Sequence, residues 1–266
     1  MIVSLLTDYG LEDDFVGVCH GVILGICPDA RIVDVTHGIA RHDVRHGAVV
    51  LRNAVPYLPV GVNVAVVDPQ VGTQRRALAV RAADDRLYVG PDNGVLSLAL
   101  ATSGGAVQAV DVTRSALRLE PVSASFHGRD VFCPIAAHLA AGADLAEVGE
   151  PIDADEIEQL ELPGPRTEGI DVRASVLLID RFGNVGLDLS HEQLAGTGLK
   201  LGSTVEVEAR GERYLASYAA TFADVSPGAV VVYEDSYRML SIAINRGDAA
   251  ATFQIAAGDE VRLRPR

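Results

Sequence analysis

Short apolar runs and longer amphipathic segments alternate along the first part of the chain. Each apolar run ends in turn residues, which is typical of a buried strand. The predicted strands cover residues 2–6, 31–35, 64–67, 77–81 and 86–89. Helical patterns fill residues 12–26, 43–57 and 131–141, and Asp43 is suited to cap the second of them. The initial strand–helix–strand–helix–strand order predicts an α/β domain with a mainly parallel sheet flanked by helices.

The pattern changes near residue 144. Acidic residues and prolines crowd residues 144–165, which is typical of a linker with a solvated surface. Beyond it, short strands alternate with turn signals and predict an all-β, barrel-like domain, either an antiparallel barrel or a sandwich. These strands cover residues 174–179, 185–189, 204–208, 212–216, 229–233, 239–244 and 260–263. The predicted domains are therefore 1–165, with the linker starting at about 144, and 166–266.

Composition excludes several classes of function. The chain has 22 basic and 36 acidic residues, a formal charge of −14, which argues against nucleic acid or an anionic membrane as the main partner. A small cationic ligand is compatible with this charge. Lys200 is the only lysine, which removes Walker-type phosphate binding and most Schiff-base chemistry.

The cysteines and the first residues of the sequence indicate the cellular compartment of the protein. The three cysteines, Cys19, Cys27 and Cys133, are odd in number and form no CxxC pair, which fits buried thiols in a reducing compartment. Met1 leads directly into an apolar strand pattern without a basic or long apolar leader. We therefore expect no signal peptide and a cytoplasmic protein.

Two acids follow predicted strands that should be neighbours. Asp68 comes directly after residues 64–67, and Asp8 follows residues 2–6. Because open α/β sheets bind ligands at the carboxyl ends of their strands, both carboxylates should face one crevice. Such an acid suits a ribose diol, although Asp8 could equally cap the following helix. Arg75 could fold back onto Asp68 as a fixed cation, or form an ordinary ion pair within the turn.

Histidines supply the other candidate chemistry. His127 lies in the loop at 123–130, where it could act as an acid, a base or a positioning group, or simply bond to a backbone carbonyl. A metal site formed by His37, His42 and His46 is a further hypothesis. No HExxH pattern or carboxylate completes a recognisable ligand set, so a solvated or half-buried histidine face is favoured.

The C-terminal part offers polar breaks between its predicted strands. Phe182 presents a π face and Asn184 an amide that both donates and accepts, a pair that suits an adenine base. Ser236 and Arg246 lie in two further breaks. All of these are also compatible with hairpin turns that have no binding function.

Taken together, five segments resemble the S-adenosylmethionine hydroxide adenosyltransferase family, which is related to the fluorinases and chlorinases. The resemblance covers essentially the whole chain and follows the family's order and spacing. The segments are Leu-Thr-Asp-Tyr-Gly at 6–10, Cys-Pro-Asp at 27–29, Val-Asp-Pro-Gln-Val-Gly-Thr at 67–73 with Arg75, Phe-His-Gly-Arg-Asp at 126–130, and Asp-Arg-Phe-Gly-Asn at 180–184. Gln70 departs from the glycine that is usual in the family.

The resemblance implies hydrolysis of S-adenosyl-L-methionine to adenosine and L-methionine by attack of an activated water or hydroxide at C5′. The family's hydrolases carry an Asp, an Arg and a His that match Asp68, Arg75 and His127, whereas its halogenases lack this set. The resemblance implies no metal and no separate cofactor, with S-adenosylmethionine as the substrate. A homotrimer with sites at its subunit interfaces is also implied.

The same resemblance implies the substrate contacts. Asp8 would hold the ribose hydroxyls, while Phe182 and Asn184 would bind adenine. Asp180 and Ser236 would contact the methionine end. Asp13 and Arg246 complete the predicted substrate-binding set.

Three alternatives remain at the level of sequence. The first is a halogenase of the same superfamily. The second is a protein that binds S-adenosylmethionine or adenosine without turnover, which would not require the Asp68, Arg75 and His127 set. The third is a Rossmann-type methyltransferase, which is disfavoured because no GxGxxG follows an early strand.

Overall fold

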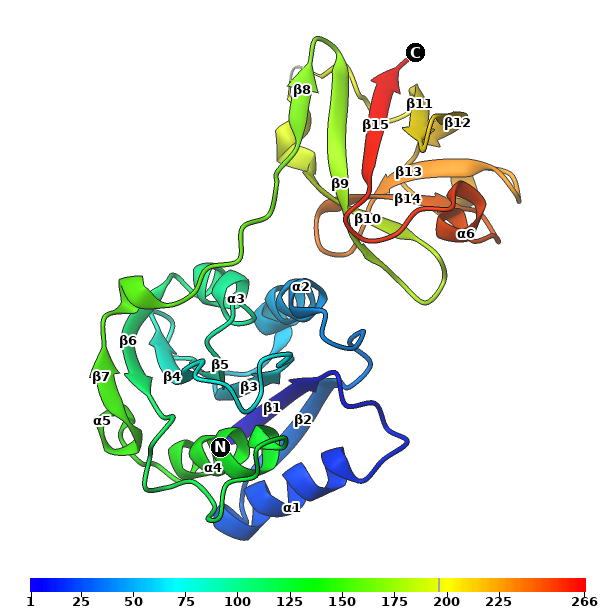
Figure 1. The fold of residues 1–266 in the computed structure, drawn as a ribbon. Helices are drawn as coiled ribbons and strands as arrows, with labels where there is room; N and C mark the ends of the chain where they lie inside the picture. Colours follow the sequence, from blue (N-terminus) through cyan, green and yellow to red (C-terminus); the bar gives the residue numbers. More distant parts are fainter. Residues whose placement is uncertain (196) are drawn as a thin grey trace. The chain divides into compact units, whose positions relative to one another are not determined.

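The computed structural model describes residues 1–195 and 197–266, which form two compact units (Figure 1). The N-terminal unit covers Met1–Leu160 and the C-terminal unit covers Glu161–Arg266. Each has its own apolar core, and each is described separately below. No helix among the described residues has the length and apolar character needed to cross a membrane.

The N-terminal unit is built on a seven-stranded sheet in the order β2-β1-β3-β5-β4-β6-β7. The first four strands in this order run parallel to one another, and the remaining pairings are antiparallel. The strands are β1 (Ile2–Thr7), β2 (Arg31–Thr36), β3 (Val62–Val66), β4 (Ala77–Ala82), β5 (Leu87–Pro91), β6 (Ala106–Asp111) and β7 (Glu150–Ile152). The predicted α/β class with a mainly parallel sheet is confirmed.

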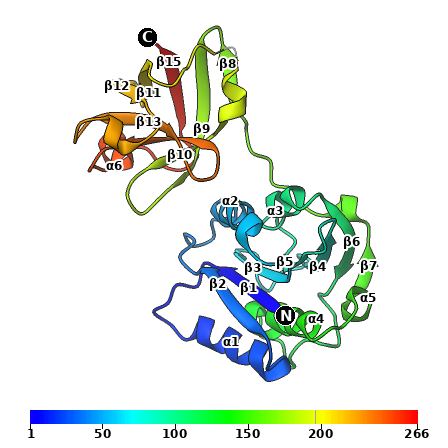
Figure 2. The same cartoon turned by 180° about the vertical axis from the view of Figure 1, so that it is seen from behind.

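Helices cover both faces of this sheet, as Figures 1 and 2 show from opposite sides. The helices are α1 (Phe15–Ile26), α2 (Val44–Ala54), α3 (Ser97–Thr102), α4 (Cys133–Ala140) and α5 (Leu145–Val148). In β3, Val64 and Val66 pack with α1 and α4, whereas Ala65 packs with α2 and α3. Alternate residues of a strand point to opposite faces, so a strand covered on both sides must be apolar throughout.

Several elements differ from the prediction. Residues 11–14 are exposed, and α1 begins only at Phe15. Asp43 does cap α2, accepting a hydrogen bond of 2.9 Å from the backbone nitrogen of His46. The predicted helix at 131–141 is observed as α4 from Cys133 to Ala140, and a π-helical turn, Gly128–Phe132, includes its first two predicted residues. Parts of the stretch 144–165 form α5 and β7, with Leu145 and Val148 buried in the core of the N-terminal unit.

The C-terminal unit is a closed barrel of seven strands. The sheet order is β10-β14-β13-β12-β11-β15-β9-β8, and the additional pairing of β9 with β10 closes the ring, leaving β8 outside it. The strands are β8 (Arg166–Glu168), β9 (Asp171–Ile179), β10 (Val185–Ser190), β11 (Thr204–Ala209), β12 (Glu212–Tyr218), β13 (Val230–Glu234), β14 (Met239–Ile244) and β15 (Glu260–Pro265), with one short helix α6 (Ala249–Phe253). The barrel prediction is confirmed, although the β12–β13 pair is parallel instead of antiparallel.

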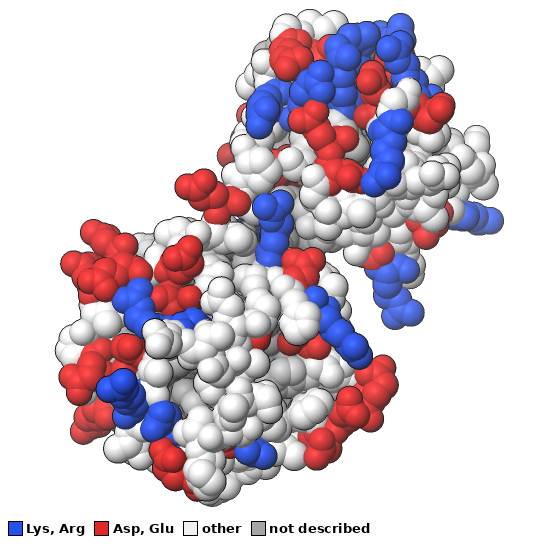
Figure 3. All heavy atoms as spheres, in the orientation of Figure 1, with Lys and Arg blue, Asp and Glu red and all other residues white. Residues whose placement is uncertain are grey.

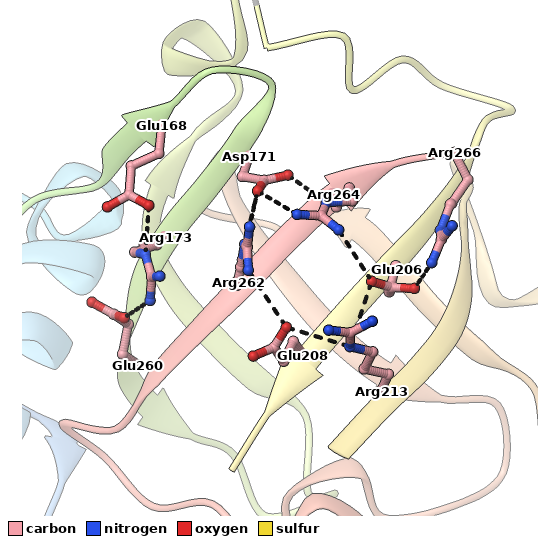
Figure 4. Close-up of polar contacts among 10 residues, drawn as sticks. All are labelled: Glu168, Asp171, Arg173, Glu206, Glu208, Arg213, Glu260, Arg262, Arg264 and Arg266. Atoms are coloured by element: carbon pink, nitrogen blue, oxygen red, sulfur yellow. Dashed lines mark hydrogen bonds and ion pairs between the residues drawn. The ribbon is translucent and has the colours of Figure 1, made fainter. Parts of the chain in front are cut away.

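A ladder of charges crosses one face of the barrel, where Figure 3 shows basic side chains gathered. At its centre, Asp171 on β9 accepts hydrogen bonds from Arg262 and Arg264 on β15 (Figure 4). Glu206 on β11 pairs with Arg264 and with Arg266. Asp171 is only 5% exposed. Hydrogen bonds from Arg264 and Arg262 therefore hold the pKa of Asp171 well below its usual range, against the opposing effect of burial.

Replacing Asp171 by asparagine should destabilise the barrel by about 1–2 kcal/mol at pH 7, because two partly exposed arginines lose their anion. A carboxylate with a depressed native pKa stabilises the fold above its unfolded value of about 3.9 and loses that contribution at lower pH. The gap between wild type and Asp171→Asn should therefore narrow as the pH falls below about 4. Urea unfolding followed by circular dichroism at several pH values measures both effects.

Glu168→Gln is the matched control, since Glu168 carries the same kind of ion pair with a side chain that is 57% exposed. It should change the free energy of unfolding by less than about 0.5 kcal/mol. An Asp171→Asn deficit that is the same at pH 7 and pH 3 would contradict the assignment.

Candidate functional site

A cavity of about 280 Å³ opens at the carboxyl ends of β1 and β3. These strands pair in parallel, so Asp8 and Asp68, which follow them, both line the cavity. The remaining lining residues are Tyr9, Asp13, Phe15, Arg41, His42, Val66, Val71, Ser125, Phe126, His127 and Gly128. All of them belong to the N-terminal unit.

Three of the predicted residues form a continuous series of contacts, in which Asp68 and His127 line the cavity and Arg75 connects them. The Arg75 Nε atom donates to Asp68 Oδ1 and Oδ2 at 3.0 and 3.1 Å, and Arg75 Nη2 also contacts Asp68 Oδ2. The same Nη2 atom lies 2.7 Å from His127 Nδ1. Arg75 therefore links the acid to the histidine, although the two are far apart in sequence.

The charged groups of Arg75 and Asp68 are largely buried. The side chains of Arg75 and Asp68 are 4% and 5% exposed. The guanidinium of Arg75 also lies over the ring of Phe132, 5.2 Å from its centroid. Loss of one partner from a buried pair typically costs about 3–5 kcal/mol, because the other charge is left uncompensated. Separation of Asp68 from Arg75 is therefore strongly disfavoured.

Loop structure explains how these groups meet. Gly72 has φ of +79°, and a side chain there would collide with the Ala124 carbonyl oxygen. The loop of Arg75 can therefore approach the loop of His127 closely. Asp130, which is 1% exposed, accepts a hydrogen bond of 2.7 Å from the backbone nitrogen of Ser123 and closes the loop that carries His127.

Electrostatics determine the charge state of His127. Burial lowers the pKa of His127, and the nearby Arg75 guanidinium lowers it further, against the opposing effect of Asp68. Because an arginine only donates hydrogen bonds, the contact with Arg75 requires Nδ1 of His127 to accept. A neutral imidazole of this kind carries its proton on Nε2, so His127 is a hydrogen-bond donor at that atom.

An aromatic group of Tyr9, Phe15 and Phe126 forms another wall of the cavity. The ring centroids of these residues are 5.0–5.8 Å apart, in tilted or edge-on arrangements. Burial raises the pKa of the Tyr9 phenol well above its usual value, so this group stays neutral. A side chain at Gly128 would collide with the Tyr9 hydroxyl. The aromatic wall was not predicted, because Phe126 is far in sequence from Tyr9 and Phe15.

One carboxylate oxygen of Asp8 binds the backbone at residue 42, beside the cavity. Its Oδ2 atom accepts a hydrogen bond of 2.9 Å from the backbone nitrogen of His42, which has φ of +64°. Asp13 also lines the cavity and is exposed. Arg41 and His42 join this set without having been predicted as cavity residues. The alternative in which Asp8 caps α1 is not what the structure shows, because α1 starts at Phe15 and its N-cap residue is Asp14.

The remaining candidates lie in the C-terminal unit. Asp180 organises its turn: Oδ1 accepts from the backbone nitrogens of Phe182 and Asn184, and Oδ2 accepts from the Asn184 amide at 2.7 Å. Phe182 is 69% exposed. Ser236 and Arg246 are exposed in the turns after β13 and β14, and Arg246 has φ of +61°.

Comparison with known proteins covers both units. A family model described as the SAM hydroxide adenosyltransferase N-terminal domain matches residues 3–149, and the corresponding C-terminal domain model matches residues 174–262. In both descriptions SAM stands for S-adenosylmethionine. Together these matches account for most of the chain.

Relatives match over nearly their full length. A protein from Salinispora tropica named (R)-S-adenosyl-L-methionine hydrolase is 46% identical over 98% of this chain and 97% of its own. A fluorinase from Nocardia brasiliensis is 29% identical over 99% of this chain and 96% of its own. The solved structure of an uncharacterized conserved protein from Thermotoga maritima matches with a TM-score of 0.92 and 35% identity, covering 99% of this chain and 100% of that one.

The contact between Arg75 and His127 predicts an NMR signature. In ¹⁵N-labelled protein, His127 should remain neutral at pH 7 with its proton on Nε2 and should titrate below the usual histidine pKa of about 6.5. Because the unfolded chain would bind a proton first, this histidine should reduce the stability of the fold as the pH drops below about 6.5.

Arg75→Met should raise the pKa of His127, because a repelling cation is lost and Asp68 is left as an attracting anion. Arg114→Met, which removes an exposed arginine of the same unit, is the matched control and should leave the titration unchanged. A wild-type His127 protonated on Nδ1 at pH 7 would refute the hydrogen-bond assignment.

Proposed function

Because the chain belongs to the S-adenosylmethionine hydroxide adenosyltransferase family, we propose that it hydrolyses S-adenosyl-L-methionine to adenosine and L-methionine. Relatives named as hydrolases are 38% and 46% identical to it, whereas the fluorinase is 29% identical. That difference favours hydrolysis over halogenation. The contact chain of Asp68, Arg75 and His127 carries the proposal, because a protein that only binds the substrate needs no water-orienting group.

The proposed reaction is an in-line displacement at C5′ of the substrate. The sulfonium makes methionine a good leaving group, so no acid is required at sulfur. Water is a weak nucleophile, and it must be positioned behind C5′, in line with the bond that breaks. S-adenosylmethionine is the substrate in this scheme, with no separate cofactor.

Three side chains are proposed to position and activate this water. His127 donates from Nε2 to the water oxygen, since its Nδ1 is engaged by Arg75. Asp68 accepts a hydrogen bond from the water and takes up its proton as the C5′–O bond forms and the C5′–S bond breaks, which makes the attacking oxygen more hydroxide-like. Arg75 fixes the positions of both groups and balances the charge of the carboxylate. Proton handling of this kind typically contributes a rate factor of about 10²–10⁴.

Substrate binding is proposed to use both units. A carboxylate has two acceptor oxygens, so Asp8 can hold the His42 nitrogen with one and a ribose hydroxyl with the other. Asp13 is proposed to assist at the same cavity. The exposed ring of Phe182 would stack on adenine, and the Asn184 amide would bond to its edge.

The methionine end is assigned to polar groups of the C-terminal unit. Asp180 would attract the substrate's ammonium group while it also orients Asn184. Ser236 would donate to or accept from the amino-acid end, and Arg246 would balance its carboxylate.

We propose an assembly that joins these two groups of candidates. We place the active site between the N-terminal unit of one subunit and the C-terminal unit of the next, in a homotrimer. The candidates on both sides of residues 160 and 161 support this arrangement. A cytoplasmic location is supported by the three buried, free cysteines, since oxidising compartments favour disulfides.

Product analysis tests the activity. Incubation of the protein with S-adenosyl-L-methionine in chloride buffer made with ¹⁸O-labelled water should yield adenosine labelled at its 5′-oxygen, together with equimolar methionine. Asp68→Ala and His127→Ala should each lower kcat by about 10²–10⁴ and change substrate affinity much less, because water is activated mainly in the transition state.

Asp14→Asn is the matched control, because Asp14 is an exposed acid just outside the cavity lining. The Asp14→Asn variant should hydrolyse S-adenosyl-L-methionine with the wild-type kcat. Formation of chlorinated adenosine would identify a halogenase, and tight binding without product would identify a binding protein. Unlabelled adenosine would reject attack by water at C5′.

Mixed subunits test the proposed assembly. Asp68→Ala should have a kcat lowered by about 10²–10⁴, and Asn184→Ala should bind substrate more weakly by about 1–3 kcal/mol, so both should turn over slowly at a low substrate concentration. After subunit exchange in an equimolar mixture, about one quarter of interfacial sites would combine two intact halves, so activity should reappear. Mixing Asp68→Ala with His127→Ala is the control and should restore nothing, because both residues belong to the same half. Sites contained within one chain would give no recovery in either mixture.

A further inference from the structure

The N-terminal unit contains a second cluster of polar side chains, which the proposed reaction does not use. His20 on α1, Asp34 on β2 and His37 in the following loop bring their side chains together from three elements. His20 Nε2 lies 2.9 Å and His37 Nε2 lies 3.1 Å from the same oxygen, Asp34 Oδ1. The three atoms all lie within 4.8 Å of one another.

The buried member of this group has an unsatisfied ring nitrogen. The side chain of His37 is 3% exposed, and its Nε2 atom makes no hydrogen bond to any described residue. Its other ring nitrogen, Nδ1, lies 2.8 Å from the Thr7 hydroxyl. When Nδ1 donates to this hydroxyl, Nε2 carries a lone pair that no hydrogen-bond donor among the described residues satisfies, and the Asp34 oxygen lies 3.1 Å away. A cation beside both atoms would be coordinated by the imidazole lone pair and by the carboxylate.

We propose that His20, Asp34 and His37 bind a divalent first-row transition-metal ion such as Zn²⁺. Two imidazole nitrogens and one carboxylate oxygen form a ligand set that suits such ions and not Mg²⁺ or Ca²⁺. Ligand atoms around tetrahedral zinc lie about 3.3 Å apart, as follows from bonds of about 2.0–2.1 Å. The observed separations of 2.9 and 3.1 Å need only a small opening, which the Asp34 side chain, 40% exposed, can supply.

Space and further support are present beside these ligands. Asp34 and His37 line a hollow of about 410 Å³, through which water can complete the coordination shell. The Thr7 hydroxyl orients His37 from behind, as an outer partner of a metal-bound imidazole does. Glu12 on the rim is engaged with the backbone nitrogen of Leu11 and is not part of the proposed ligand set.

An ion at this position would stabilise the loops that form the cavity. The carbonyl oxygen of His37 accepts a hydrogen bond of 2.8 Å from the nitrogen of Gly10. Thr7, Asp8 and Tyr9 directly precede this glycine, and the last two line the cavity. The metal would therefore have a structural function, tying α1 and β2 to the start of the substrate loop. Binding of the ion does not depend on the proposed hydrolysis.

Metal titration of the untagged, chelator-treated full chain tests this proposal without any substrate. Zn²⁺ added in a calorimeter should bind at one ion per chain, Co²⁺ should develop the visible absorption of a nitrogen-ligated site, and Mg²⁺ should give no signal. Zn²⁺ should also raise the melting temperature, because it binds the folded chain. His20→Gln and Asp34→Asn should each weaken the affinity by at least about tenfold.

His138→Gln is the matched control, since His138 lies on α4 outside this group. It should bind Zn²⁺ as the wild type does. The two ligand variants involve partly exposed side chains, and circular dichroism before titration verifies that they are folded. Absence of binding at one ion per chain, or equal binding by His20→Gln and Asp34→Asn, would show an ordinary hydrogen-bonded cluster and overturn the proposal.

Discussion

The buried ion pair of Asp68 and Arg75 is the constraint on which the candidate site depends. Two charges that are almost fully withdrawn from water must stay paired, because either one alone would carry a desolvation cost of several kcal/mol. The loop between them must therefore turn back on itself, and Gly72 permits this turn. With its Nε atom committed to Asp68, Arg75 directs Nη2 towards His127 and determines the tautomer of that ring.

Parallel pairing of β1 and β3 brings the second acid to the same cavity. Because helices cover both faces of the sheet, its interior strands are apolar, and polar chemistry is confined to the strand ends. Asp8 follows β1 there, while Thr7, one residue earlier, contacts His37 on the other side. A single residue step along the chain thus separates an acid of the substrate cavity from the hydroxyl that contacts the proposed metal ligand His37.

Many carboxylates of this acidic chain hold loops in place instead of facing solvent. Asp180 closes the turn that carries Phe182 and Asn184 through three hydrogen bonds. Asp235 acts in the same way on the turn after β13, accepting from the nitrogens of Tyr237 and Met239. The formal charge of −14 consequently overstates the solvated negative surface, because part of it is engaged with backbone nitrogens and arginines.

Local sequence patterns determined much of this protein. Apolar runs closed by turn residues predicted most strands of both units, since a strand buried on both faces requires such a run. Motif order predicted the family and brought Asp68, Arg75 and His127 forward as one set. Short elements such as α3, β6 and α6 escaped prediction, because their burial comes from packing against distant segments and not from a local period.

Tertiary structure alone decided which groups meet and in what state. The aromatic wall of Tyr9, Phe15 and Phe126, and the convergence of His20 and Asp34 on His37, join residues with no regular spacing. From the sequence, His37, His42 and His46 formed one hypothetical group, in which only His42 and His46 have helical spacing. Contacts across elements depend on strand order and loop path, and these follow from the summed packing of the whole unit.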